Sequence, residues 1–131
     1  MNELVAELAK LVAGDVGRLP LLQGVAQAAL DDVALARPPL SVSRSALVKV
    51  LEAWRRGDCR ADEVQQWASF VRRGYVAGKA GAPLRPIEIA YDAGDEALLA
   101  GIIGRFDEIG DPIDGDLEEA EQLEMLQALR R

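Results

Sequence analysis

Apolar residues recur at helical spacing along most of the chain, and the most regular pattern lies between Ser43 and Tyr75. Two sets of residues with the spacing i, i+3, i+4, i+7 stand 17 positions apart in this stretch, at 47, 50, 51, 54 and at 64, 67, 68, 71. Each set forms one apolar stripe on a helix of 3.6 residues per turn. Both segments end in Arg-Arg-Gly, where glycine favours helix termination and the arginines oppose the negative end of the helix dipole. The pattern predicts a central helical hairpin whose first helix is capped by Ser43.

Shorter apolar stripes predict a pair of helices on each side of this hairpin. The N-terminal pair should cover residues 3–13 and the stretch from Pro20 to the residue before Pro38. The C-terminal pair should run from Asp92 or Asp95 to Gly110, and from a cap at Asp116 to the end of the chain.

Two glycines, Gly101 and Gly104, fall inside the first of the C-terminal helices. Each costs about 1 kcal/mol relative to alanine in a helix interior. This cost would be more plausible if another helix crossed closely at this point.

Three segments depart from helical spacing. Residues 38–42 read as a connector, and residues 75–86, rich in Gly, Ala and Pro, read as a surface loop. Residues 87–91 alternate apolar and polar side chains, which fits one short extended segment with no evident partner strand.

The expected fold is therefore a single all-α domain over residues 1–131, with five to six helices built around the central hairpin. Its three parts are an N-terminal helix pair, the hairpin and an acidic C-terminal helix pair, at residues 1–37, 43–75 and 92–131. This fold class leaves room for the extended segment near 87–91.

Composition adds a compartment to this picture. Half of the 131 residues are hydrophobic and 28% are charged, which is typical of one soluble globular domain. The first twelve residues carry charges among their apolar positions, unlike a signal peptide, and no apolar run approaches the ~18 residues of a membrane span. Cys59 is the single cysteine, which agrees with a reducing environment. We expect a cytoplasmic protein that does not bind membranes.

The charge is distributed very unevenly along the chain. Residues 44–85 contain nine bases and four acids, whereas residues 86–129 contain thirteen acids and a single base, Arg105. An acidic segment of this strength repels nucleic acid and anionic membranes and attracts a basic protein. The alternative is that these acids only solvate two helices and their loops.

Residues for common catalytic chemistry are largely missing. The chain has no histidine and only one cysteine, which excludes Ser-His-Asp and Cys-His catalysis and the usual zinc sites. Phosphate-binding glycine signatures are absent, and an EF-hand alignment that ends at Glu121 places Gly110 and Pro112 where carboxylates are needed. We expect a protein that is not an enzyme and that uses no metal or cofactor, although a pair of carboxylates acting as acid and base stays open.

The tryptophans and arginines of the hairpin have two interpretations. Trp54 and Trp67 lie in the apolar stripes and are expected in the core, and Cys59 is expected to be a small buried residue ahead of the second helix. The arginine pairs could instead belong to a helix-turn-helix that reads DNA, because a short glycine turn joins the two helices. The sequence pI near 4.6 argues against that reading.

Residues 46–70, ALVKVLEAWRRGDCRADEVQQWASF, resemble the helix-turn-helix segment of small bacterial toxin-immunity proteins of the colicin D immunity kind. The features that match are the glycine that ends the first helix and, after a short turn, a small residue, an acid and an amphipathic helix, here Gly57, Ala61, Glu63 and Trp67. The resemblance implies a small cytoplasmic protein without catalytic activity that binds a basic nuclease toxin through an acidic surface.

These observations together favour a protein-binding domain that acts through its acidic C-terminal part, most specifically an immunity-type inhibitor of a basic toxin. A helical oligomerisation or adaptor module and a nucleic-acid binder are the alternatives, and homo-oligomers fit the first of these. The predicted contact residues cluster around the last interhelical turn and are Asp107, Glu108, Asp111, Asp114, Asp116, Glu118 and Glu119.

Overall fold

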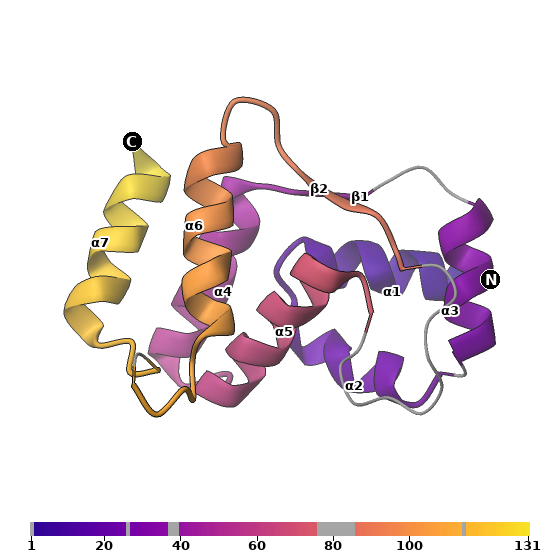
Figure 1. Cartoon of the computed structure of the whole chain (residues 1–131), viewed down its shortest axis with the longest axis horizontal. Helices are drawn as coiled ribbons and strands as arrows, with labels where there is room; N and C mark the ends of the chain where they lie inside the picture. Colours follow the sequence, from indigo (N-terminus) through magenta and orange to yellow (C-terminus); the bar gives the residue numbers. More distant parts are fainter. Residues whose placement is uncertain (1, 26, 37–39, 76–85, 114) are drawn as a thin grey trace.

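The computed structural model is mostly helical and contains one small parallel sheet (Figure 1). It describes residues 2–25, 27–36, 40–75, 86–113 and 115–131. In chain order the elements are α1 (Asn2–Val12), the 3-10 helix η1 (Val16–Arg18), α2 (Leu19–Gln23), α3 (Gln27–Ala36), β1 (Leu40–Val42), α4 (Arg44–Arg56), α5 (Ala61–Arg73), β2 (Ile89–Tyr91), α6 (Glu96–Asp107) and α7 (Glu119–Arg130).

The mostly helical character is confirmed, but the expected five to six helices become seven α-helices among the described residues. The additional helix arises because the single helix expected after Pro20 is divided into α2 and α3. Gly24 is the C-cap of α2, and its N–H bonds to the carbonyl of Leu22. A glycine weakens a helix interior, and here the chain turns at it.

The Ser43 cap and the two glycine helix ends are confirmed. The Ser43 hydroxyl accepts a hydrogen bond from the N–H of Ala46 at 3.2 Å, and Gly57 ends α4 in the left-handed conformation. Gly74 ends α5 in the same way, and the Glu63 carboxylate accepts from the N–H of Arg60 at 2.9 Å. These bonds join residues at most four positions apart, so the local sequence specifies them.

The central pair is not the closely packed hairpin that the stripes suggest. Helix α5 packs mainly against α6, and α4 packs mainly against α7 (Figure 1). The apolar stripe of α5 is fully buried at Trp67, whose indole N–H donates to the carbonyl of Leu11 at 2.7 Å. Helix α5 is therefore the structural centre, where the N-terminal and C-terminal parts of the chain meet.

The extended segment near 87–91 does have a partner strand. Strand β2 pairs in parallel with β1, in the register Leu40–Ile89, Ser41–Ala90 and Val42–Tyr91. The partner lies in the segment expected to be only a connector, and the prolines at 38 and 39 obscured it because proline argues against strand. Most of the expected loop, residues 76–85, lies outside the described residues.

The close helix crossing that would have explained Gly101 and Gly104 is not found among the described residues. No heavy atom of the residues that the structure describes would lie within 4 Å of a Cβ at either position, apart from their own helix backbone. Both glycines sit on the outer side of α6, because the residues that α6 buries are Leu99, Ile102, Ile103 and Phe106.

Two further expectations fail at the ends of the C-terminal helices. Asp95 precedes α6 but makes no capping bond, because its carboxylate binds Arg44 of α4 at 2.8 Å. Helix α7 begins later than expected, with Glu118 and not Asp116 at its N-cap. Its buried residues are Met125, Leu126 and Leu129, whereas Leu123 is 41% exposed.

Candidate functional site

The connection between α6 and α7, residues 108–118, is hereafter called the acidic turn. Two backbone hydrogen bonds close it: Gly110 donates to the carbonyl of Gly115 at 3.3 Å, and Gly115 donates to the carbonyl of Asp111 at 2.9 Å. A Cβ on Gly115 would overlap the backbone of Asp111, so only glycine fits there. These bonds fix the positions of Gly110, Asp111 and Gly115 relative to one another.

Arg105 connects this turn to both neighbouring helices. Its Nε donates to the Glu121 carboxylate at 2.7 Å, and its Nη2 donates to the carbonyl of Asp116 at 2.9 Å. Its Nη1 lies 3.5 Å from the carboxylate of Glu108. The single base among residues 86–129 thus anchors the turn from the end of α6.

Asp107 is drawn into the protein and away from the predicted contact surface. Its side chain is 7% exposed, and one carboxylate oxygen accepts from Arg72 at 2.8 Å and from Arg73 at 3.1 Å. Its other oxygen accepts from the Gln65 amide at 3.0 Å. Asp107 therefore ties α6 to α5, and the arginines at the end of α5 have a partner beyond their own helix dipole.

Four other predicted contact residues lie on the surface, and they differ in whether their carboxylates form ion pairs. Glu108 faces Arg105, and Glu119, whose side chain is 75% exposed, binds Arg55 of α4 at 3.2 Å. Asp116 and Glu118 are exposed, and neither carboxylate is bonded to any residue that the structure describes.

The remaining two predicted contacts lie at the tip of the turn. Asp111 accepts the N–H of Ile113 on its carboxylate at 2.8 Å, which shapes the tip, and Asp114 lies outside the described residues. The tip also carries Ile113 itself, which is 88% exposed and which was not among the predicted contact residues. The sequence could have indicated this exposure, because Ile113 stands in a turn between Asp111 and Asp114 and belongs to no apolar stripe.

A hollow of 440 Å³ opens beside the acidic turn and was also not anticipated. Its lining combines apolar residues, two glycines and two acidic residues: Trp54, Ala61, Ile109, Gly110, Gly115, Asp116, Leu117 and Glu118. Trp54 was expected in the core but is only half-buried, with its ring edge-on to Phe106 at a centroid distance of 6.4 Å. It is the last residue of its stripe, three positions before the helix ends at Gly57.

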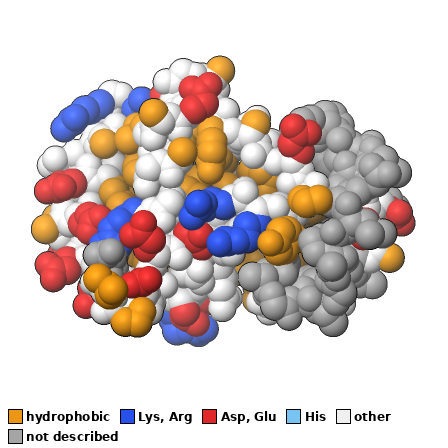
Figure 2. All heavy atoms as spheres, in the orientation of Figure 1, with side chains coloured by type: hydrophobic (Ala, Val, Ile, Leu, Met, Phe, Trp, Pro, Cys, Tyr) orange, Lys and Arg blue, Asp and Glu red, His pale blue; other side chains and the backbone are white. Residues whose placement is uncertain are grey.

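Figure 2 shows acidic and apolar side chains next to one another over the region where α6 connects to α7. An apolar centre with charged residues around it is the usual anatomy of a protein-binding surface. The acidic turn and its hollow therefore form the strongest candidate site.

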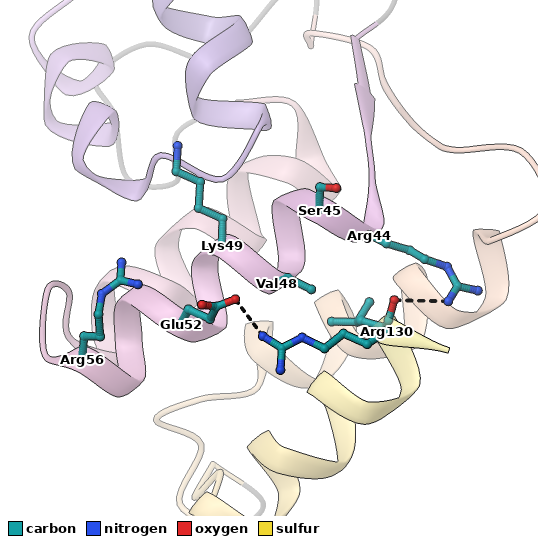
Figure 3. A pocket seen from close by; sticks show the side chains of 8 residues that line it. Arg44, Ser45, Val48, Lys49, Glu52, Arg56 and Arg130 are labelled. Atoms are coloured by element: carbon teal, nitrogen blue, oxygen red, sulfur yellow. Dashed lines mark hydrogen bonds and ion pairs between the residues drawn. The ribbon is translucent and has the colours of Figure 1, made fainter.

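A second hollow, of 420 Å³, lies between α4 and α7, and half of its lining residues are bases (Figure 3). Two of its arginines, Arg44 and Arg130, hold the two helices together. Arg130 binds Glu52 at 2.8 Å, and Arg44 donates to the carbonyls of Ala128 and Leu129 at the end of α7 while also binding Asp95. These contacts give the hollow a structural role.

The described residues offer little for covalent or metal chemistry. Burial raises the pKa of the Cys59 thiol, which opposes thiolate formation. Within the described ranges, no three His, Cys, Asp or Glu side chains are grouped so that they could hold a metal ion. No described helix has the length and apolar character needed to cross a membrane.

Comparison with known proteins gives no match to a family model, a curated protein or a solved structure. The resemblance of residues 46–70 to toxin-immunity proteins therefore stays a prediction.

Proposed function

We propose that this protein is a non-enzymatic binding domain that captures a basic protein partner on its acidic turn. The most specific form of the proposal is an immunity-type inhibitor that covers the cationic cleft of a toxin. The observation that carries it is the pair of exposed carboxylates of Asp116 and Glu118, unbonded to described residues and set beside an apolar hollow and the exposed Ile113.

The electrostatics support a steered encounter. Residues 86–129 contain thirteen acids against one base, so this part of the chain attracts cations over a distance of about one Debye length, ~8 Å at physiological salt. Complementary charge mainly raises the association rate and selects the partner. Apolar groups that become buried in the contact then slow dissociation, because central desolvated residues contribute most of the binding energy.

The closed backbone of the turn also favours binding. A loop that already holds its shape loses little conformational entropy when a partner docks. Arg105 and the bonds between Gly110 and Gly115 provide this preorganisation.

The test is affinity capture from the native cell, followed by association-rate measurements on the captured partner. The double variant Asp116→Asn/Glu118→Gln removes two charges at the turn. The control Asp32→Asn/Glu88→Gln removes the same charge from exposed positions on α3 and just before β2, away from the turn (Figure 1). We expect the first variant to slow association several-fold at low salt and the control to change it little. Equal effects of the two variants would show that only net charge matters and would overturn the contact assignment.

A second candidate function is a helical oligomerisation or adaptor module, and the outer face of α6 favours it. Ala97, Ala100 and Gly101 are exposed there, and the two glycines of this helix have no described neighbour that would exclude a side chain. Small residues allow close approach of a second helix. Sedimentation velocity over a range of concentrations tests this: a concentration-dependent dimer that Gly101→Leu abolishes favours the module, whereas a monomer throughout opposes it.

The nucleic-acid alternative gains no support from the contacts of α5. Six of its thirteen residues are buried, and Arg72 and Arg73 at its end bind Asp107. A recognition helix needs an open face to enter the major groove.

A further inference from the structure

We infer that the hollow beside the acidic turn receives one arginine side chain of the basic partner. This inference deepens the proposed function and rests on it. The hollow's 440 Å³ falls within the range of small-ligand sites, about 300–1,000 Å³. It opens where the end of α4, the start of α5 and the acidic turn meet, which are the positions of Trp54, Ala61 and Leu117.

The walls suit the aliphatic part of an arginine side chain. Trp54, Ile109 and Leu117 contribute apolar surface, and Ala61 leaves space between them because it has only a methyl group. Long cationic side chains commonly lay their methylene groups along such surface while the charged end stays at the mouth. A guanidinium group also stacks favourably on an indole ring.

The carboxylates suit the charged end. Asp116 and Glu118 both line the hollow, and neither is bonded to a described residue. Their backbones are fixed, because the Asp116 carbonyl accepts from Arg105 and the Glu118 carbonyl accepts from the N–H of Gln122 at 3.1 Å. A guanidinium group offers five donors in a planar fork, which matches the acceptor oxygens of carboxylates.

Neighbouring arginines of the chain itself have other partners. Arg55, next to Trp54, binds Glu119, and Arg60, next to Ala61, binds Asp62 at 3.0 Å. An anion would be repelled by the two carboxylates, and a purely apolar ligand would leave them without a bond. A side chain with an aliphatic stem and a cationic end complements both the apolar walls and the two acidic residues of the hollow.

The probes for this inference are matched tripeptides, acetyl-Gly-Arg-Gly-amide and its citrulline analogue, which has the same shape without the charge. Binding is followed by the NMR shifts of the Trp54 indole N–H and the Gly115 amide. We expect the arginine peptide to bind about tenfold more tightly than the citrulline peptide. A lysine tripeptide should bind more weakly than arginine, and equal binding would overturn the preference for a guanidinium group.

Two variants separate the contribution of the apolar walls to arginine binding from that of the two carboxylates. Ala61→Met fills the hollow and leaves every charge in place, and Asp116→Asn/Glu118→Gln leaves the space and removes the charges. Each should weaken the arginine peptide about tenfold. Unfolding midpoints close to that of the wild type establish that both variants fold.

An oligolysine peptide distinguishes failure of this inference from failure of the proposed function. If oligolysine shifts the amides of the acidic turn but Ala61→Met does not weaken the arginine peptide, the hollow is not an arginine site and the proposed acidic surface stands. If neither oligolysine nor the arginine peptide binds, both proposals are overturned.

Discussion

Gly101 and Gly104 should lower the stability of the domain, because no packing contact among the described residues offsets their cost in the helix. Both lie in the interior of α6 outside the left-handed region, Gly101 is exposed, and no described atom beyond their helix would contact a Cβ at either position. Alanine is favoured over glycine in a helix interior by about 1 kcal/mol. The double variant Gly101→Ala/Gly104→Ala should therefore raise the free energy of unfolding by about 2 kcal/mol.

Urea and thermal unfolding followed by circular dichroism measure this change. In a domain of this size about 2 kcal/mol corresponds to a rise of roughly 6–8 °C in the unfolding midpoint. Gly57→Ala is the matched control, because a Cβ there also meets no described atom within 4 Å, but its φ of +82° is left-handed. The control should lose about 1 kcal/mol through backbone strain alone.

Destabilisation by Gly101→Ala/Gly104→Ala would refute this reasoning. It would mean that a second molecule or another part of the chain covers the outer face of α6. Sedimentation velocity on the same samples would then show whether the wild type self-associates through that face.

Three further predictions concern the interior and its ionisable groups. The hydrogen bond from Arg44 lowers the pKa of Asp95, so the pair stabilises the fold above a carboxyl's ordinary pKa of about 4 and loses this effect as pH falls through the lowered value. Asp95→Asn should thus be less stable than wild type at pH 7, and the difference should disappear in acid unfolding experiments. Trp67→Phe removes the bond to the Leu11 carbonyl and leaves a void, which should cost about 2 kcal/mol in urea unfolding. The buried Cys59, whose pKa is raised, should react slowly with a thiol reagent at pH 7 and rapidly once urea unfolds the protein; fast labelling of the folded state would contradict its placement.

The sequence by itself determined the features that depend on neighbours along the chain. The Ser43 cap and the left-handed glycines at 57 and 74 were predictable, because each forms bonds within about one helical turn. The burial of Trp67 followed from the period of its stripe. The concentration of acids after residue 86 is likewise a property of the sequence alone.

Only the tertiary structure decided which distant groups meet. The pairing of Leu40–Val42 with Ile89–Tyr91 joins segments almost fifty residues apart, and a three-residue strand carries too little pattern to reveal its partner. Asp95 was one of the two predicted caps of this helix, but its carboxylate accepts a hydrogen bond from Arg44 and does not cap the helix.

The same division applies to the candidate site. The sequence identified the acidic turn but could not distinguish Asp107 from the neighbouring acids. Asp107 differs because Arg72 and Arg73 at the end of α5 bind its carboxylate in the folded protein. The hollow is formed by α4, the start of α5 and the acidic turn, so no single stretch of sequence contains its signal. The charge of each residue can be read from the sequence. Its exposure and the shape around it depend on which helices pack together, so the packing determines which acids can contact a partner.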